Sequence, residues 1–551
     1  MRRRPVPRPV PAPPKAAYRV GPVPKWLRSV VLILCGLVLI GWFASPVANP
    51  DTWWHLETGR YIWRTHQLPS PDPFALTTAS ARPAYPDEPK VRQFNLTHEW
   101  LAQLIFYLAW SVAGPAGLVL LRALMLAAFC ALAGAIVYRR SGGLYRAVMA
   151  ALAAAAVAGN FAADRPFLFT YLLLAVTVYL LETGAGRWTI WLLPPIFLFW
   201  ANCHGGYFLG WVALAAYSLE ALKAEDKKRP APRLWIAAAA SVFICGANPN
   251  GFRALTVTLA YRSSLLQGSL WEWQHPQLWP PDLFAIVLFL SAAALLWRRR
   301  GVRIADWILF AAFSAAALLA IRNTILIGWL GPILIASYVP AFALPVLAEF
   351  AAALLLIAAA VYEAMQGNPL RVEQWLYPQG AADFLLARHI PGPIFNSYEH
   401  GGYLMWRLWP EHKVFIDGRA LSESVFHDYQ RMLYAMPSQN GEKSGLDLLD
   451  QYGIQAIVLN GFEYGSGAPY LLNVAFADPR QAAWKLVYQD AQSMVFVRDL
   501  PPGVAALPPS DIFRSLESQC STHIAHIPSE SLCAPYLQEV ERRAGFSPQG
   551  R

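Results

Sequence analysis

Apolar runs separated by short polar loops fill the first two thirds of the chain. A run of about twenty apolar residues forms a helix long enough to cross the roughly 30 Å hydrocarbon core of a bilayer. We expect about eleven crossings, near residues 26–47, 116–138, 147–163, 166–182, 188–203, 206–222, 234–247, 282–297, 304–320, 322–340 and 341–361. The pattern predicts a polytopic α-helical membrane protein.

The first crossing is followed by a long polar loop, residues 48–98, and then by the apolar stretch 99–113. That stretch is short for a crossing, so we interpret it as a helix lying in or dipping into the outer interface. The basic loops 139–146, 223–233 and 298–303 then all fall in the cytoplasm, as the positive-inside rule requires. An odd number of crossings places the C-terminus outside.

The pattern changes after residue 362 to short β-rich runs separated by helical segments. Runs at 393–398, 413–417, 454–460, 484–490 and 493–499 predict strands, the last two as a hairpin, and runs at 381–389 and 446–453 predict helices. This alternation predicts a water-soluble α/β domain, residues 362–500, on the non-cytoplasmic side. We expect residues 1–25, rich in Pro and Arg, to be a disordered cytoplasmic tail and residues 501–551 to be an irregular strap.

Composition supports the membrane assignment, since 56% of the residues are hydrophobic and only 15% are charged. The net charge of +10 collects in the tail and the basic loops, which indicates membrane topology and not a nucleic-acid surface. Four of the six cysteines lie in apolar runs and are interpreted as small buried hydrophobes. Cys520 and Cys533 lie in a polar region that the topology places in an oxidising compartment. They either form a disulfide or remain free thiols, and both alternatives stay open.

The first loop opens with a polar and aromatic segment that carries candidate chemistry. Asp51 and His55 are four residues apart, so on a helix they share one face, with Trp54 beside them. A carboxylate at the mouth of a membrane cavity can act as a general base, and His55 can orient it or bind phosphate. The alternative is that Asp51 caps a helix and the tryptophans form an interfacial belt.

Two further segments of this loop are polar. Asp72 stands between two prolines, which favours a turn over a reactive role. His98 and Glu99 precede an apolar helix, so they either cap it or face the same outer cavity as Asp51. Asp51, His55, His98 and Glu99 are together possible ligands of a divalent ion, although no spacing requires a metal.

Polar groups recur at the outer ends of later spans. They are Asp164, Arg165, Asn202, His204, the segment 248–251, Glu272, His275, Arg322 and Asn323. Charges at membrane depth are costly unless they line a polar cavity, so their collection at one side favours a site. Arg165 and Arg322 suit a phosphate, because a guanidinium is always charged and its donors form a fork. The alternative is that each arginine reaches the lipid headgroups.

Several motifs resemble those of a known family. DTWWHLETGRYI, PSPDPFALT, HEWL, WANCHGGYFLG, NPNGF and RN occur in an order similar to that in bacterial polytopic membrane proteins counted with the GT-C glycosyltransferases. The segment FNSYEHGGYLMWRLWPEHKVFIDGR resembles the soluble part that ends those proteins. The resemblance covers most of the chain between residues 49 and 498.

The GT-C resemblance implies an essential acid near the start of the first outer loop, interfacial helices and a sugar donor linked to a lipid phosphate. Asp51 matches the acid, and residues 99–113 match an interfacial helix. Many relatives carry an adjacent acidic pair, whereas here Asp51 is followed by Thr52. A second acid is common in a later outer loop, for which Asp164 is the candidate unless it is an ion-pair partner.

We therefore predict a glycosyltransferase of the bacterial inner membrane that moves a sugar from a polyprenyl-phosphate carrier to a glycan, lipid or protein acceptor on the periplasmic face. The catalytic candidates are Asp51, Asp164 and Glu99, and the substrate-binding candidates are His55, His98, Arg165, His204 and Arg322. No nucleotide-binding glycine loop is visible, no resident metal is assigned, and no nucleic-acid partner is expected. The alternative is a non-catalytic glycolipid-binding, flippase or envelope-assembly protein.

Overall fold

The computed structural model describes residues 25–544 apart from residues 80, 185–187, 224–230, 261–270, 341–345, 366, 465, 479–482 and 527–529. The predicted disordered tail falls on residues 1–24, outside the described part. Most of the predicted cytoplasmic loop 223–233 also lies outside it.

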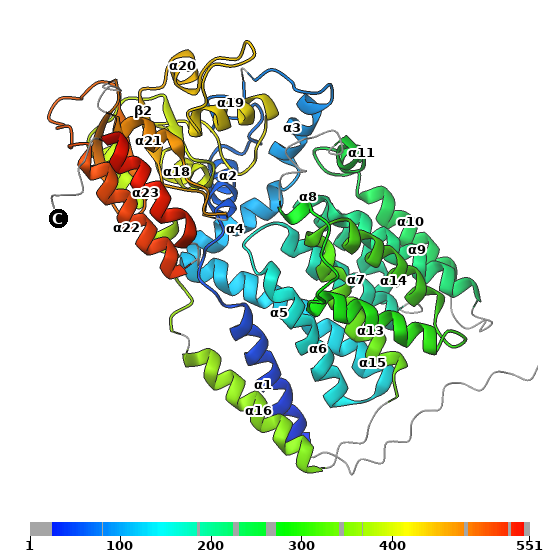
Figure 1. Cartoon of the computed structure of the whole chain (residues 1–551). Helices are drawn as coiled ribbons and strands as arrows, with labels where there is room; N and C mark the ends of the chain where they lie inside the picture. The colour runs from blue at the N-terminus through cyan, green and yellow to red at the C-terminus, as the bar shows by residue number, and fades with distance from the viewer. Residues whose placement is uncertain are drawn as a thin grey trace, which may run out of the picture.

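Apolar helices form a bundle that carries the C-terminal domain at one end (Figure 1). They are α1 (Lys25–Phe43), α5 (Pro115–Ser141), α6 (Leu144–Ala158), α7 (Phe167–Gly184), α8 (Leu193–Cys203), α9 (Phe208–Lys223), α10 (Ala231–Ile244), α13 (Leu283–Trp297), α14 (Ile304–Leu319), α15 (Thr324–Tyr338) and α16 (Val346–Met365). Each predicted crossing overlaps one of these helices. The chain is therefore an α-helical membrane protein.

Length and composition alone make four described segments able to cross a membrane. These are Lys25–Phe43, Pro115–Ser141, Leu144–Phe161 and Ile321–Tyr338. Five further apolar helices are shorter, with 10–17 residues. The number of crossings thus stays a prediction.

Small residues allow the longest of these helices to pack closely. α5 has Pro115 in its first turn, where no backbone N–H is needed, and it ends before Gly142, whose φ of 70° suits a glycine. A Cβ atom at Gly134 would lie 2.7 Å from the carbonyl oxygen of Ala147 in α6. Such close backbone approach is typical of helix pairs in membranes.

The first polar loop folds into helices at the end of the bundle that we call the outer end. They are α2 (Asp51–Thr65) and α3 (Glu88–Thr97), followed by α4 (Trp100–Ala113). α4 packs against α2, α5 and α8, and it coincides with the stretch that we interpret as interfacial. The short helix α11 (Arg253–Ala260) lies against α3.

The C-terminal domain contains a four-stranded sheet in the order β1-β2-β4-β3. Its elements are α17 (Gln379–Ala387), β1 (Ile394–Asn396), α18 (Tyr398–Leu408), α19 (Glu423–Leu433), α20 (Gly445–Gln451), β2 (Ala456–Leu459), α21 (Leu471–Ala477), β3 (Lys485–Gln489) and β4 (Met494–Val497). β1 and β2 are parallel, while β4 is antiparallel to both β2 and β3. The predicted α/β character and the terminal hairpin are confirmed.

One predicted strand is wrong. The run 413–417 does not join the sheet, because its backbone pairs with the first loop instead. Val414 donates its N–H to the carbonyl of Phe74 at 3.1 Å and accepts from the N–H of Leu76 at 3.0 Å. The residues have strand-like composition, but their partner lies more than 300 residues earlier in the chain.

The prediction of an irregular strap after residue 500 is also wrong. Residues Ser510–His526 form α22 and Glu530–Ala544 form α23. The two helices pack together (Figure 1) and are joined by a disulfide between Cys520 and Cys533. Pro508 and Pro509 precede α22, and Pro535 lies inside α23.

The C-terminal domain sits directly on the first loop. Trp53 of α2 is 3% exposed and packs edge-on against Tyr377 and Tyr403. Arg60 donates to the carbonyl oxygen of Trp406 at 2.8 Å and covers that ring. These contacts fix the start of α2 between the helical bundle and the C-terminal domain.

Candidate functional site

Asp51 is the first residue of α2. Its side chain makes no capping hydrogen bond, so the cap alternative is wrong. At the N-terminus of α2 the side chain of Asn49 instead accepts a hydrogen bond from the Asp51 N–H at 2.9 Å. Its Oδ1 accepts from the indole N–H of Trp54 at 3.0 Å. Trp53 and Trp54 are buried among protein side chains, so they do not form an interfacial belt.

A chain of ion pairs joins Asp51 to residues from three distant segments. The guanidinium of Arg165 lies 3.3 Å from Asp51 Oδ2 and donates to Glu272 Oε2 at 3.0 Å. Arg322 lies 3.6 Å from the other oxygen of Glu272 and covers the ring of Trp273. We call Asp51, Arg165, Glu272 and Arg322 the outer cluster. Its side chains are 19%, 24%, 28% and 24% exposed, respectively.

Glu99 gathers three histidines beside this cluster. Its carboxylate lies 3.2 Å from His98, 3.7 Å from His204 and 3.9 Å from His55. It occupies the cap position of α4, but its side chain makes no capping bond. Arg165 lies near enough for its charge to act on Glu99, so the two groups of residues form one continuous polar region.

Neighbouring groups fix the orientation of two of these rings. His98 Nδ1 faces the carbonyl oxygen of Phe94 at 3.0 Å, which can only accept, so Nδ1 carries a proton. His204 Nδ1 accepts from the N–H of Gly206 at 3.1 Å, so its proton lies on Nε2, toward Glu99. Thr170 bridges His204 Nδ1 to the indole of Trp200. The polar atoms aimed at Glu99 are therefore held in place.

The buried surroundings change how readily the two acids ionise. Burial raises the pKa of Asp51, and the opposing effects of Arg165 and the Trp54 hydrogen bond do not cancel it. Burial also acts to raise the pKa of Glu99, but the contact with His98 outweighs it and holds that pKa below its usual range. Burial lowers the pKa of His55 and of His204 to about 3, so these two rings are neutral and add little to that effect. Asp51 is thus the better proton acceptor of the two.

Asp164 lies apart from the outer cluster. Its Oδ2 pairs with Arg122 of α5 at 2.8 Å, and both side chains are almost fully buried. This geometry favours the ion-pair alternative for Asp164, although the partner is Arg122 and not the adjacent Arg165. In the described contacts Asp164 therefore does not join the other polar candidates at the outer ends of the spans.

The remaining polar groups at this end have structural roles. Asn202 accepts from the indole of Trp100 at 2.9 Å, and Asn250 donates to Thr97 at 2.9 Å. His275 contacts the carbonyl oxygen of Leu318 at 2.8 Å. Asp72 forms the expected turn by accepting from the Phe74 N–H, and it also pairs with Arg419 of the C-terminal domain at 3.1 Å.

Sequence reasoning noted Glu272 but did not select it, and it missed Arg122 and Thr170. Their partners are more than 30 residues away in the chain. An acid that faces two arginines has no local signature in the sequence. The nearest signal was the recurrence of polar residues at the outer ends of spans.

No group of three or more His, Cys, Asp or Glu side chains among the described residues is arranged to hold a metal ion. The acids of this region are instead paired with cations or histidines.

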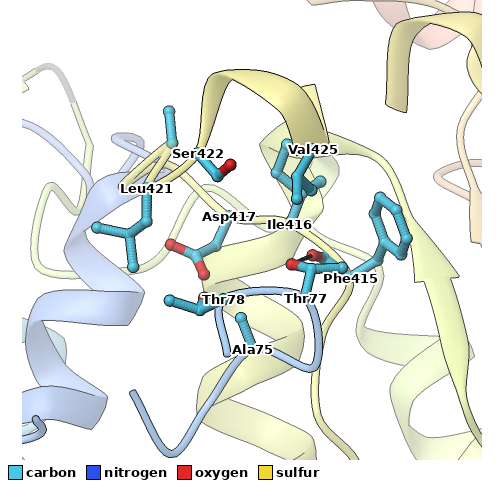
Figure 2. A pocket seen from close by; sticks show the side chains of 10 residues that line it. Ala75, Thr77, Thr78, Phe415, Ile416, Asp417, Leu421, Ser422 and Val425 are labelled. Carbon is cyan, nitrogen blue, oxygen red and sulfur yellow. Dashed lines mark hydrogen bonds between the residues drawn. The ribbon is translucent and has the colours of Figure 1, made fainter. Parts of the chain in front are cut away.

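A small pocket of about 20 Å³, with room for about one water molecule, lies beside the site, between the first loop and the C-terminal domain. Figure 2 shows Thr77 and Thr78 of the loop facing Asp417 and Ser422 of the C-terminal domain. Asp417 also accepts two hydrogen bonds from the Arg419 guanidinium, each of 2.7 Å. The lining is mostly apolar, and its polar side chains are those of Thr77, Thr78, Asp417 and Ser422.

No family model matches the chain, and no curated protein matches it significantly. Among solved structures it is similar to the archaeal oligosaccharyltransferase AglB from Archaeoglobus fulgidus, in complex with an inhibitory peptide and a dolichol-phosphate. That match has a TM-score of 0.52 and 11% identity, and it covers 88% of this chain and 76% of the other. A second structure of the Archaeoglobus fulgidus enzyme, tethered to an acceptor peptide, gives 0.48 with 11% identity over 95% and 83%. The first of these matches shows that the chain has a fold similar to that of the archaeal oligosaccharyltransferase.

Proposed function

We propose that this protein is a membrane glycosyltransferase that moves a sugar from a polyprenyl-phosphate donor to an acceptor on the non-cytoplasmic face, with Asp51 as the general base. The similar archaeal enzyme was solved with a dolichol-phosphate, which supports a lipid-phosphate donor. The disulfide in the C-terminal domain supports an oxidising compartment for that domain.

The observation that carries this proposal is the outer cluster. Two arginines from different segments face the same carboxylate, Glu272, at 3.0 and 3.6 Å. A place where two guanidinium groups converge on one anionic group is suited to a phosphate. Asp51 lies at the other side of Arg165, so a base and an anion site are adjacent.

The proposed reaction is a direct displacement. The hydroxyl proton of the acceptor goes to Asp51, and the acceptor oxygen forms a bond to the anomeric carbon of the sugar. The bond from that carbon to the phosphate oxygen breaks, and its electron pair leaves with the lipid phosphate. Arg165 and Arg322 stabilise the charge on the departing phosphate. A leaving group of this kind requires no nucleotide.

The histidines around Glu99 shape the substrate side of the site in this proposal. His204 directs its Nε2 proton toward Glu99, and His98 Nε2 lies 3.2 Å from the same carboxylate. An acceptor or donor hydroxyl entering here meets both a donor and an acceptor. His55 lies between this group and Trp54, whose ring centroid is 3.5 Å from its own.

The test is the substitution Asp51→Asn, assayed with a polyprenyl-phosphate sugar in nanodiscs. Asparagine keeps the size of the side chain and can still accept from Trp54, so the fold is expected to persist. Loss of the base is expected to reduce turnover by about a hundredfold or more.

The matched control is Asp87→Asn, in the same loop, where the carboxylate is 55% exposed and pairs with Lys90 at the surface. It is expected to turn over normally. Near-normal turnover by the Asp51 variant would sink the proposal and favour a protein that binds or moves glycolipids without cleaving them.

A further inference from the structure

The backbone of the C-terminal domain comes unusually close to Asp51. A Cβ atom placed on Gly418 would stand 2.0 Å from Asp51 Oδ1 and 3.1 Å from the indole nitrogen of Trp54. Real Cβ atoms do not approach other heavy atoms so closely. Only a residue without a side chain fits at position 418 while the Asp51 carboxylate keeps its place.

Two more glycines allow the same approach. A Cβ atom on Gly402 of α18 would lie 2.8 Å from the carbonyl oxygen of Pro50, directly before Asp51. A Cβ atom on Gly401 would lie 2.0 Å from the carbonyl oxygen of Ile416. α18, the turn at 416–419 and the start of α2 are thus packed backbone against backbone.

The turn that carries Gly418 is anchored on several sides. Asn396 at the end of β1 donates to the carbonyl oxygen of Ile416 at 2.8 Å. The hydroxyl of Tyr398 donates to the carbonyl oxygen of Gly418 at 3.0 Å. Arg419 is buried, bonds to Asp417 and pairs with Asp72 of the first loop. This turn is therefore a fixed surface.

We propose that Gly418 is a positioning residue of the active site: the turn at 416–419 forms a wall that holds the Asp51 carboxylate toward Trp54 and Arg165. The proposal rests on the proposed role of Asp51 as the base. The C-terminal domain then completes the site of the membrane part. A side chain at 418 would first meet the Asp51 carboxylate and then the indole nitrogen of Trp54 that donates to it.

The test is Gly418→Ala. The φ angle of Gly418 is not in the left-handed region, so alanine adds no backbone strain. The methyl group meets mainly the end of the Asp51 side chain, which can rotate away. We expect an inserted, folded protein whose turnover falls by about tenfold to a hundredfold, because a carboxylate displaced by about 1 Å no longer meets its substrate.

Two comparisons separate positioning from a structural effect. Gly36→Ala in α1 is the matched control, since no atom lies within 4 Å of the added Cβ, and it is expected to have normal turnover. Combined with Asp51→Asn, Gly418→Ala is expected to cause less than about a twofold further loss, because the two act through one carboxylate.

If Gly418→Ala fails to fold, Tyr398→Phe is the second variant. It removes only the hydroxyl that anchors the Gly418 carbonyl, and it is expected to slow turnover about threefold, within the range for lost positioning. Normal turnover of either folded variant, while Asp51→Asn is inactive, overturns the inference and leaves the proposed function intact. A full additional loss on the Asp51→Asn background also overturns it. An active Asp51→Asn variant overturns the proposed function itself.

Discussion

Two groups of charged side chains stand at opposite ends of the same helices and differ in how completely they are paired. α7 begins near Arg165 of the outer cluster and carries Glu182 near its other end. α14 carries Asp306 near its start and leads to Arg322. Glu182 and Asp306, with Arg140 and Arg303, form what we call the inner cluster.

All four carboxylate oxygens of the inner cluster accept hydrogen bonds. Arg140 donates to both oxygens of Glu182 at 2.9 and 3.2 Å and to both oxygens of Asp306 at 3.0 Å. Arg303, Tyr217 and Tyr338 supply further donors to these acids. Glu182 is 7% exposed and Asp306 is not exposed at all.

The outer cluster is built from the same residue types but is open. Among the described contacts Arg322 has one ion pair, at 3.6 Å, and a ring beneath it. Its members are between 19% and 28% exposed. Buried charges that are fully bonded hold helices together, whereas partly bonded charges that reach solvent are available to a ligand. Residue type alone does not distinguish the two.

The largest expected effect is on the inner cluster. Arg140→Gln leaves Glu182 and Asp306 without their main partner in a buried place, so it is expected to lower the free energy of unfolding by about 3 kcal/mol or more. Thermal unfolding of the detergent-solubilised chain measures this, with the exposed neighbour Arg139→Gln as the control. Unchanged unfolding together with lost transfer would make the inner cluster functional and break the comparison.

The next largest effect is expected in the outer cluster, where turnover and not stability is expected to fall. Arg322→Gln removes a guanidinium from the proposed phosphate site, so turnover is expected to fall by about tenfold to a hundredfold, or about 1.4 to 2.7 kcal/mol in the barrier. Its free energy of unfolding is expected to change by less than about 0.5 kcal/mol, because the side chain is partly exposed. Arg299→Gln, at an exposed position, is the matched control. Strong destabilisation without loss of turnover would contradict the proposal.

Glu399, in the C-terminal domain, is an acid to set beside those of the two clusters. No arginine or lysine pairs with it among the described residues, and its oxygens accept the hydroxyl of Tyr470 at 2.7 and 2.9 Å. Burial raises the pKa of Glu399 from 4.5 to about 7. Between these two pH values the folded state holds the proton that the unfolded state has released.

Stability is therefore expected to fall as the pH rises from 4.5 to about 7 and to level off above that. We expect the contribution of Glu399 to be on the order of 1 kcal/mol, since the group is partly exposed. Thermal unfolding of the wild type and of Glu399→Gln across this window measures it. Glutamine can still accept from Tyr470 but does not titrate, so an unchanged slope in the variant would show that Glu399 is not the source.

The sequence alone determined the elements whose signal is local. Apolar runs long enough for a bilayer predicted where the membrane helices lie, and alternating runs predicted the α/β character of the C-terminal domain. The spacing of Asp51 and His55 placed both on one helix, and the recurring polar residues mark the end of the bundle where the outer cluster lies. Each of these features depends on residues within about one helix length of each other.

Only the tertiary structure decided which polar groups meet. Arg165 and Arg322 converge on Glu272, Asp164 pairs with Arg122, and the run 413–417 pairs with the first loop instead of the sheet. The same holds for Gly418, whose missing side chain leaves room for Asp51. Such contacts depend on how helices cross and on where one domain rests on another, and hydrophobic periodicity carries no information about either.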